Sequence, residues 1–422
     1  MVEVMRINKI EEMYGFHFAD VDIQLIDYED TPSISVKILL ETLHSDSPAL
    51  TDEESKRLYK AVEEDYMDIP RAADRRKLMK ETICICGGGS LGHVVAGYLA
   101  AKEHVNVNVL TQRPSCWNSV LHITTPEGDV LDGHLHLVTD EPALAMKDCS
   151  IVLLCLPGFA IKEQLHRISP YVNEHTYVGS VFSSTGFFFH ALEILDGNVP
   201  LWGFQRVPFI ARTTRYGESA NLLGYKNAHN IAVERSKDKE AFRAKIETLF
   251  DAPVRLLANY YEASLTNSNP LLHTSRLYTM FGGENEGRVF PRMILFYEEW
   301  TREAAQLLID MDEEFFRLLD VLPVSKGYLP RILDYYESHD ADSLARKLSS
   351  IQGFKGITSP MVQTEEGWVP DFRSRYFTED FPYGLHYIWK LAHEKSIPVP
   401  NIDKVYEWGM GKALSLCRTD IS

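Results

Sequence analysis

The sequence predicts an α/β fold followed by an all-α domain. A doubly wound, mostly parallel sheet comes first, a mainly helical domain follows, and a small α/β extension precedes both. Two observations carry this prediction. Short apolar runs alternate with helix-like segments between residues 81 and 181, which is typical of strand–helix–strand units. From about residue 259 the apolar spacing becomes mostly helical. We therefore divide the chain into an extension (1–80), a sheet domain (81–258) and a helical domain (259–422).

The composition is that of a globular protein with an acidic surface. The 422 residues are 45% hydrophobic and 24% charged, and the formal net charge is −17. Such a charge disfavours nucleic-acid and anionic-membrane partners over most of the surface, so a bound anion needs a local basic or backbone-amide site. No apolar run reaches the ~18 residues of a membrane span, and the N-terminus lacks the apolar stretch of a signal peptide.

The cysteines indicate a reducing compartment. There are six of them, at positions 84, 86, 116, 149, 155 and 417, and three fall in apolar, strand-like runs. Cys84 and Cys86 point to opposite faces of one strand, so they cannot form a local metal-binding pair. We expect reduced thiols, no metal site and a cytoplasmic protein.

The extension shows structural signals but no recognisable chemistry. Val21–Ile26 alternates like a strand, and Ser33–Leu43 reads as a strand running into a helix. Thr51 begins a predicted helix that ends near Tyr66, because its hydroxyl can cap free amides and the acids after it suit a helix N-terminus. The basic stretch 71–80 is interpreted as a solvated linker.

The sheet domain is predicted from alternating strands and helices. Strands are expected at 82–86, 105–110, 150–156 and 176–181, helices at 94–101 and 159–169, and a hairpin or meander at 121–138. Two further strands flank Tyr216 within 210–233, and a helix is expected at 237–250.

The helical domain is predicted to contain one unusually long helix. Pro291–Leu322 is periodic enough to form a single helix of roughly 48 Å at ~1.5 Å per residue. Such a helix serves either as a core element or as the spine of a homodimer, and the sequence leaves both open. A last helix is expected at 404–416, after Pro398 and Pro400.

A glycine-rich loop predicts the cofactor. Gly87, Gly89 and Gly92 lie directly after a buried strand and directly before a helix. That context makes the G-x-G-x-x-G pattern a Rossmann-type dinucleotide fingerprint rather than an ordinary strand–helix turn. The first glycine permits the turn, the second admits the pyrophosphate, and the third lets helix and strand pack closely. The pyrophosphate would meet the free amides of the helix N-terminus.

The end of the second strand favours NADP over NAD. NAD sites usually place an acid there for the ribose 2′-hydroxyl, but this strand is followed by Thr111 and Arg113, which suit a 2′-phosphate. The alternative is an exposed arginine without a ligand. A Pro-Gly corner at Leu156–Gly158 ends another strand at the same edge. The expected dinucleotide contacts are Gly87, Gly88, Gly89, Ser90, Leu91, Gly92, Thr111, Arg113, Leu156 and Pro157.

Two segments of the helical domain are candidates for the catalytic groups. In the first, Asn269 can cap a helix with Pro270 in its first turn, which places His273 one turn inside. The second, Arg373–Gly384, is dense in charged and aromatic residues. On spacing alone, a structural histidine and a solvated loop are the alternatives to a proton-transfer site.

These segments together resemble the octopine/nopaline (opine) dehydrogenase family. The resemblance rests on the glycine loop after the Cys84-Ile-Cys86 strand, on Asn-Pro-x-x-His273, and on Arg375-Tyr-Phe-Thr-Glu-Asp380-Phe-Pro-Tyr-Gly-Leu. It covers roughly residues 81–415. It implies a Rossmann domain, a helical domain, and reduction by a nicotinamide cofactor of an imine formed from an amino acid and a 2-oxo acid.

The resemblance also implies roles for three residues. His273 matches the family's catalytic acid/base, and Asp380 matches the carboxylate that orients this histidine. Arg375 matches an arginine that pairs with Asp380 or clamps a substrate carboxylate. Three features depart from the family pattern. The loop reads Gly-Gly-Gly-Ser90-Leu91-Gly92, Thr274 follows the histidine where the family often has proline, and the extension lies outside the usual family core.

Substrate carboxylates need cations in an acidic protein. Arg206, Arg212, Arg215 and Arg276 lie near the candidate segments, and Arg276 is favoured because it shares a helix face with His273. Our expected substrate contacts are Arg276, Asn269 and Arg206. Two other functions stay open: a simple NADPH-dependent keto- or hydroxy-acid reductase that needs no amine, and a non-catalytic dinucleotide-binding regulator.

Overall fold

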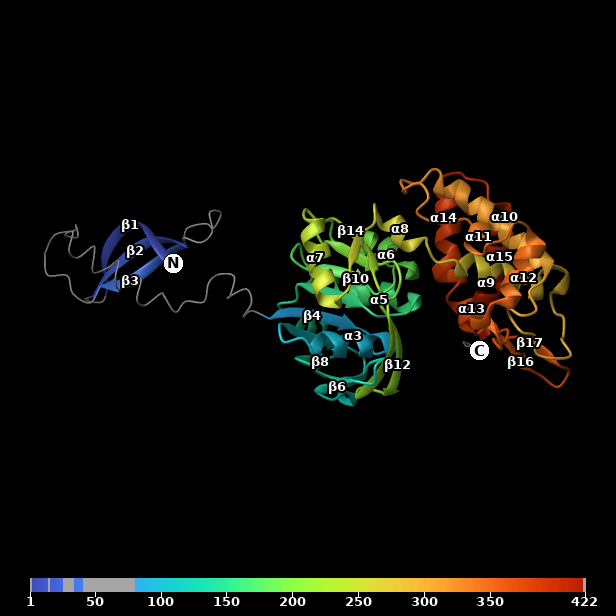
Figure 1. Cartoon of the computed structure of the whole chain (residues 1–422), viewed down its shortest axis with the longest axis horizontal. Helices are drawn as coiled ribbons and strands as arrows, with labels where there is room; N and C mark the ends of the chain where they lie inside the picture. The colour runs from blue at the N-terminus through green and yellow to red at the C-terminus, as the bar shows by residue number, and fades with distance from the viewer. Residues whose placement is uncertain (1, 14–15, 26–33, 41–79, 420–422) are drawn as a thin grey trace. The chain divides into compact units, whose positions relative to one another are not determined.

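The computed structural model describes residues 2–13, 16–25, 34–40 and 80–419. The chain divides into two compact units, Met1–Met79 and Lys80–Ser422 (Figure 1). The first unit contains an antiparallel meander of β1 (Val2–Met13), β2 (Phe16–Leu25) and β3 (Ile34–Leu40). The predicted strands at 21–26 and from Ser33 overlap β2 and β3, whereas β1 was not predicted. The helix expected from Thr51 and most of the basic linker lie outside the described residues.

The second unit begins with the predicted doubly wound sheet. Its strand order is β15-β14-β11-β10-β9-β4-β5-β8. Neighbouring strands run parallel except for β11 and β14, which are antiparallel. The strands are β4 (Glu81–Cys86), β5 (Val105–Leu110), β8 (Leu137–Thr139), β9 (Ile151–Leu154), β10 (Tyr177–Ser180), β11 (Leu201–Phe204), β14 (His229–Glu234) and β15 (Val254–Leu256).

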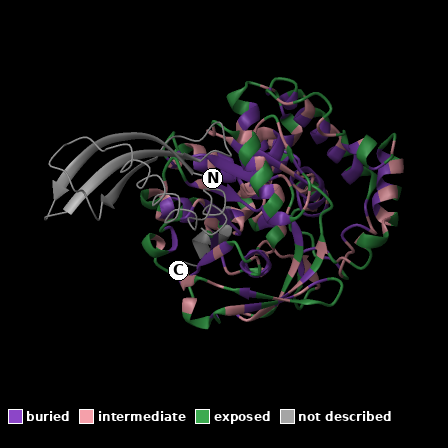
Figure 2. Ribbon diagram, turned by 60° about the vertical axis from the view of Figure 1, so that its left-hand side comes forward, coloured by how far each residue is buried: buried purple, intermediate pink, exposed green. Residues whose placement is uncertain are grey.

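Helices bury both faces of this sheet, as a doubly wound fold requires (Figure 2). Ile83 and Ile85 of β4 point into one apolar cluster, and Cys84 and Cys86 point into the other. The first cluster is covered by α3 (Ser90–Ala100) and α7 (Lys239–Phe250), and the second by α4 (Pro142–Ala145), α5 (Gly158–Ile168) and α6 (Phe187–Ile194). Cys84, Cys86, Cys116, Cys149 and Cys155 are free thiols.

A second, four-stranded sheet flanks the first. It has the order β12-β13-β6-β7 and comprises β6 (Val120–Thr124), β7 (Val130–His134), β12 (Phe209–Arg215) and β13 (Ser219–Tyr225). β6 and β7 form the predicted hairpin. The two strands expected around Tyr216 are present as β12 and β13. A third strand, β14, was not predicted there; a second polar turn at 226–228 returns the chain to the main sheet.

The helical domain surrounds an apolar core. Its helices are α8 (Tyr260–Ser264), α9 (Asn269–Phe281), α10 (Arg302–Leu319), α11 (Ile332–Tyr335), α12 (Ala341–Ser350), α13 (Arg375–Thr378), α14 (His386–Glu394) and α15 (Pro400–Thr419). A small hairpin of β16 (Met361–Gln363) and β17 (Trp368–Pro370) completes it. Short helical turns are η1 (Pro114–Cys116), η2 (Ser169–Tyr171), η3 (Ser183–Thr185), η4 (Gly283–Asn285), η5 (Gln352–Phe354) and η6 (Phe381–Leu385). In the described residues, no helix is long and apolar enough to cross a membrane.

The single long helix predicted at 291–322 is wrong. Helix α10 has 18 residues and begins after Thr301, whose side-chain hydroxyl accepts a hydrogen bond of 3.2 Å from the Ala304 amide. Residues 291–300 are irregular because their aromatic side chains, including Phe296 and Tyr297, are buried in the core. The apolar face of α10 packs into the same core, which makes this helix a core element.

Candidate active site

The glycine loop has the geometry of a dinucleotide cradle. Gly87 has φ +124°, a conformation that side chains other than hydrogen rarely adopt. A Cβ atom on Gly92 would lie 2.1 Å from the Gly87 carbonyl oxygen, so the third glycine permits the close packing of α3 on the loop. At Gly89, by contrast, no described atom lies within 4 Å of an added Cβ atom. The backbone at Gly89 is therefore open to a pyrophosphate, and the amides of α3 begin there.

Most of the expected dinucleotide contacts line one cavity beside this loop. Gly87, Gly88, Thr111, Arg113, Leu156 and Pro157 all contribute to its wall. Ser90 does not, because its hydroxyl lies 3.1 Å from the Thr213 hydroxyl and accepts a hydrogen bond from the Thr213 amide. Leu91 packs against the sheet-domain core. These residues fit a nicotinamide dinucleotide, whose redox chemistry is hydride transfer.

Tyr216 is a cavity residue that the sequence did not indicate. It lies in the turn between β12 and β13, and its hydroxyl is 3.4 Å from the Thr111 hydroxyl. The Arg113 guanidinium lies over its ring at 4.4 Å. Burial raises the pKa of Tyr216, but the hydrogen bond from Thr111 and the charge of Arg113 outweigh it, and the net pKa is lowered. Tyr216 thus packs against Arg113 in the wall of the cavity.

The predicted His–carboxylate pair is present in the helical domain. His273 Nδ1 lies 2.8 Å from Asp380 Oδ2, and both residues are largely buried. His273 lies in the first turns of α9, and Asp380 precedes the η6 turn. Asn269 is not the helix cap. It is the first helical residue, Ser268 precedes it, and the Asn269 amide donates to Asn267 Oδ1 at 3.3 Å. Since Asn269 and His273 are four residues apart, they share one face of α9.

Tyr297 is a second residue that sequence reasoning missed. Its hydroxyl lies 2.8 Å from His273 Nε2, so both ring nitrogens of the histidine are engaged. Tyr297 is 5% exposed and belongs to the irregular segment before α10. Burial raises its pKa, which keeps the phenol neutral. Asp380 therefore engages Nδ1 of the imidazole, and the Tyr297 hydroxyl engages Nε2.

Arg276 is buried beside this segment, and its expected contact with substrate stays a prediction. The side chain is 3% exposed. Its Nε donates to the Phe296 carbonyl at 3.1 Å and its Nη2 to the Glu299 carbonyl at 2.7 Å. Burial lowers its pKa to about 10. Arg276 therefore ties the backbone on both sides of Tyr297 to α9.

We expect Tyr297→Phe to lower kcat about 10-fold, because Nε2 loses its anchor. Tyr376→Phe is the matched control, since that ring lies 4.8 Å from the His273 ring without a hydrogen bond to it in the described structure. Steady-state kinetics of both variants check the prediction. A Tyr297→Phe variant with wild-type kcat contradicts it.

The loop that carries Asp380 also contacts the sheet domain. Glu379 Oε2 accepts a hydrogen bond of 3.3 Å from the Gly158 amide, at the first turn of α5. Burial raises the pKa of Glu379, while the Arg375 charge and this hydrogen bond oppose the rise. A Cβ atom on Gly158 would lie 2.4 Å from the Tyr383 ring. The loop that carries Asp380 is thus held against the residue that follows the Leu156–Pro157 corner of the cavity.

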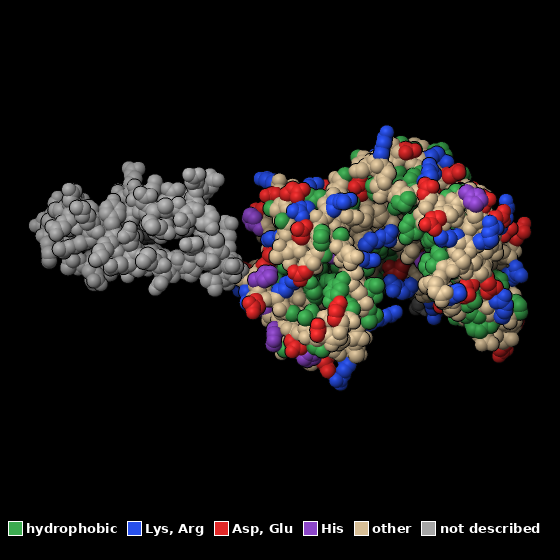
Figure 3. Space-filling view, viewed as in Figure 1, with side chains coloured by type: hydrophobic (Ala, Val, Ile, Leu, Met, Phe, Trp, Pro, Cys, Tyr) green, Lys and Arg blue, Asp and Glu red, His purple; other side chains and the backbone are tan. Residues whose placement is uncertain are grey.

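The other predicted cations have different surroundings. Arg375 is exposed, and in the part of the chain that the structure describes it makes no ion pair with Asp380. Arg215 pairs with Glu218 at 2.7 Å, and Arg212 is exposed on β12. Arg206 Nη2 donates to the Thr266 carbonyl at 2.6 Å. Figure 3 shows Lys and Arg side chains gathered where the surface is hollowed between the sheet and helical domains.

A Rossmann-type sheet, an open glycine loop and an adjacent proton-transfer pair define a nicotinamide-dependent oxidoreductase. Comparisons with known proteins agree. The model of the NAD/NADP octopine/nopaline dehydrogenase alpha-helical domain matches residues 256–412, and that of ketopantoate reductase PanE/ApbA matches residues 83–182. Residues 256–412 thus carry the octopine/nopaline dehydrogenase domain that the resemblance implied, and the chain is an NAD(P)-dependent oxidoreductase.

Individual relatives cover most of the chain. An opine dehydrogenase from Haliotis discus hannai is 27% identical over 362 residues, covering 78% of this chain and 89% of that protein. The structure of octopine dehydrogenase with NADH and L-arginine has a TM-score of 0.69 at 23% identity, covering 79% of this chain and 89% of that one. Yersinopine dehydrogenase with NADP+ bound has a TM-score of 0.61 at 14% identity, covering 82% and 93%. These structures confirm the predicted fold class.

Proposed function

We propose that this enzyme reduces the imine formed from an amino acid and a 2-oxo acid, or oxidises the resulting secondary amine. Condensation of the amine nitrogen with the carbonyl carbon releases water and gives the imine. A hydride then adds to the imine carbon and a proton to the nitrogen, so the product is a secondary amine. The observation that carries the proposal is the His273–Asp380 pair at 2.8 Å, held beside the cofactor corner by the Glu379–Gly158 hydrogen bond.

His273 is the general acid/base in this proposal. Asp380 accepts from Nδ1, which fixes the ring, and Nε2, which contacts the Tyr297 hydroxyl, gives the proton to the substrate and recovers it in reverse. Arg375 is exposed next to this pair and is proposed to clamp a substrate carboxylate. Asn269 is proposed to contact the substrate from the same helix face as His273.

We further propose that NADP is the preferred cofactor. Arg113 and the Thr111 hydroxyl line the cavity at the end of β5, where a 2′-phosphate would lie, and both suit an anion. The bound cofactor supplies the hydride. Thr111 and Arg113 would hold the phosphate, and Tyr216 would keep the guanidinium in place.

Arg113→Ala should weaken NADPH binding about 10- to 100-fold and leave NADH binding nearly unchanged, because it removes charge-assisted hydrogen bonds to the phosphate. Fluorescence titration of both cofactors measures this, and Lys147→Ala, which removes an exposed charge of the same domain, is the control. An unchanged NADPH affinity, or a higher kcat/KM with NADH in the wild type, contradicts the NADP assignment.

The activity is tested by following oxidation of NADPH and NADH with pooled 2-oxo acids, with and without pooled amino acids. Oxidation that requires both pools supports imine reduction. A simple keto-acid reductase is the second candidate, favoured by the match of residues 83–182 to ketopantoate reductase. Oxidation with oxo acids alone, at a rate that amines do not change, would establish that candidate instead.

A further inference from the structure

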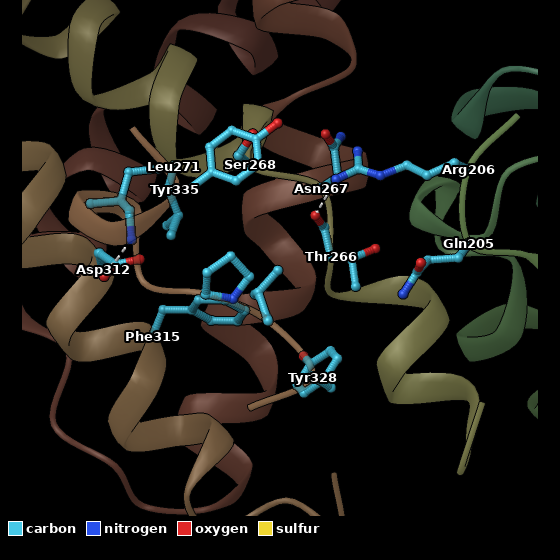
Figure 4. Close-up of a pocket in the computed structure, with 13 residues that line it drawn as sticks. Gln205, Arg206, Thr266, Asn267, Ser268, Leu271, Asp312, Phe315, Tyr328 and Tyr335 are labelled. Atoms are coloured by element: carbon cyan, nitrogen blue, oxygen red, sulfur yellow. Dashed lines mark hydrogen bonds between the residues drawn. The ribbon is translucent and has the colours of Figure 1, made fainter. Parts of the chain in front are cut away.

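A second cavity lies at the junction of the sheet and helical domains. It is lined by Gln205 and Arg206 after β11, by residues 266–268 and Leu271 at the start of α9, and by α10 and the 328–335 segment (Figure 4). Strands β9, β10 and β11 run parallel to one another. Arg206 follows β11 and the Leu156–Pro157 corner follows β9, so both lie at the same edge of the sheet. Ligands bind at this edge in open α/β sheets.

The charge of Arg206 is not neutralised by an acid in this cavity. Its guanidinium donates a hydrogen bond to a neutral group, the Thr266 carbonyl, and no carboxylate of the described chain pairs with it. The carboxylate that does line the cavity, Asp312, is engaged elsewhere. It accepts from the Ile332 amide at 3.3 Å and lies 4.0 Å from Arg331. Burial raises the pKa of Asp312 to about 6. The cavity therefore presents an unbalanced positive charge.

Two buried hydroxyl groups in the cavity wall also lack partners. Thr266 is 5% exposed, and neither its Oγ1 nor the Tyr328 hydroxyl has a hydrogen-bond partner among the described residues. A buried polar atom without a partner costs about 1–3 kcal/mol, so such atoms point to a ligand. Hydroxyl donors beside a guanidinium are the groups that bind a carboxylate.

The size of the cavity indicates which part of a ligand it takes. Its volume is ≈ 190 Å³, below the roughly 300–1,000 Å³ of sites that hold whole ligands. One end of a substrate fits there. Leu271 and Ser268 in its wall lie two and five residues before His273, which places the cavity at the same end of α9 as the candidate site.

We propose that this cavity binds the side-chain carboxylate of an acidic amino-acid substrate and that Arg206 selects for that charge. The inference rests on the proposed imine reduction and specifies its amine. Arg206 is a specificity residue here, whereas Arg375 serves the carboxylate that every amino acid or oxo acid carries.

The test compares isosteric substrates that differ in charge. With saturating NADPH and pyruvate, kcat/KM is measured for L-glutamate against L-glutamine and for L-aspartate against L-asparagine. We expect at least one acid to exceed its amide about 10-fold or more in the wild type. Arg206→Gln should reduce this ratio to within about 2-fold, Arg206→Lys should retain most of it, and Arg206→Glu should favour the amide. Arg255→Gln, which removes an exposed charge on β15, is the control and should keep the wild-type ratio.

Several results would overturn the inference while leaving imine reduction intact. These are an acid-to-amide ratio near 1 in the wild type, an equal loss for acid and amide in Arg206→Gln, or a rise confined to the KM for pyruvate. Thermal melting and NADPH affinity of each variant separate misfolding from lost selectivity, and Arg206→Lys remains informative if Arg206→Gln unfolds. Failure of every amine to stimulate NADPH oxidation contradicts the proposed function itself.

Discussion

His273→Ala is expected to lower kcat about 1,000-fold while leaving NADPH affinity within about 2-fold of the wild type. The reason is the separation of roles between the two domains. The cofactor cavity is built from residues of the sheet domain, and His273 lies in α9 with Nδ1 on Asp380 and Nε2 on Tyr297. Removing the imidazole deletes the proton exchange and leaves the dinucleotide contacts in place.

Steady-state kinetics and cofactor titration of His273→Ala check this expectation. Asp380→Asn is the companion variant. It keeps the shape of the carboxylate but not its charge, so it should lower kcat about 10- to 100-fold, since the imidazole loses the carboxylate that orients it. Turnover of His273→Ala within about 10-fold of the wild type would remove the acid/base role.

Gly92→Ala and Gly89→Ala should have separate effects on stability and on cofactor binding. An added Cβ atom on Gly92 would lie 2.1 Å from the Gly87 carbonyl oxygen, so α3 must move away from the loop. We expect a loss of about 1–3 kcal/mol in the free energy of unfolding together with loss of cofactor binding. At Gly89 no described atom is within 4 Å, so Gly89→Ala should fold normally.

The methyl group of Gly89→Ala would project where we place the pyrophosphate, and NADPH affinity should fall about 10-fold or more. Thermal melts without cofactor and titrations with NADPH distinguish the two variants. Normal NADPH affinity in Gly89→Ala would show that the dinucleotide does not approach this part of the loop.

The sheet domain was predictable because its signals are local. The β4 strand, the glycine loop and α3 follow one another directly in the sequence. The spacing of the glycines alone therefore indicates why glycine is required at each position. The prediction of one long helix at 291–322 is wrong because residues 291–300 have helix-like apolar spacing. Their aromatic side chains are instead buried as an irregular segment, and the Thr301 cap starts α10 later. Tertiary packing outweighed local periodicity there.

The His273–Asp380 pair could be predicted only from the resemblance to a known family. Spacing alone left His273 as a structural histidine, and Asp380, 107 residues away, has no local relation to it. Tyr297 and Tyr216 were missed for the same reason, since each meets its partner through the fold rather than through a motif. Arg276 shares a helix face with His273. That position alone does not reveal that its guanidinium donates hydrogen bonds to two backbone carbonyls.

Isotope transfer tests the central claim most directly. The enzyme is incubated with deuterium-labelled NADPH, a 2-oxo acid and a nitrogen-labelled amino acid, and the products are analysed by mass spectrometry. We expect one product that carries both the deuterium and the labelled nitrogen, and we expect His273→Ala to make almost none of it. A deuterated hydroxy acid without the labelled nitrogen would contradict imine reduction and make the protein a simple keto-acid reductase.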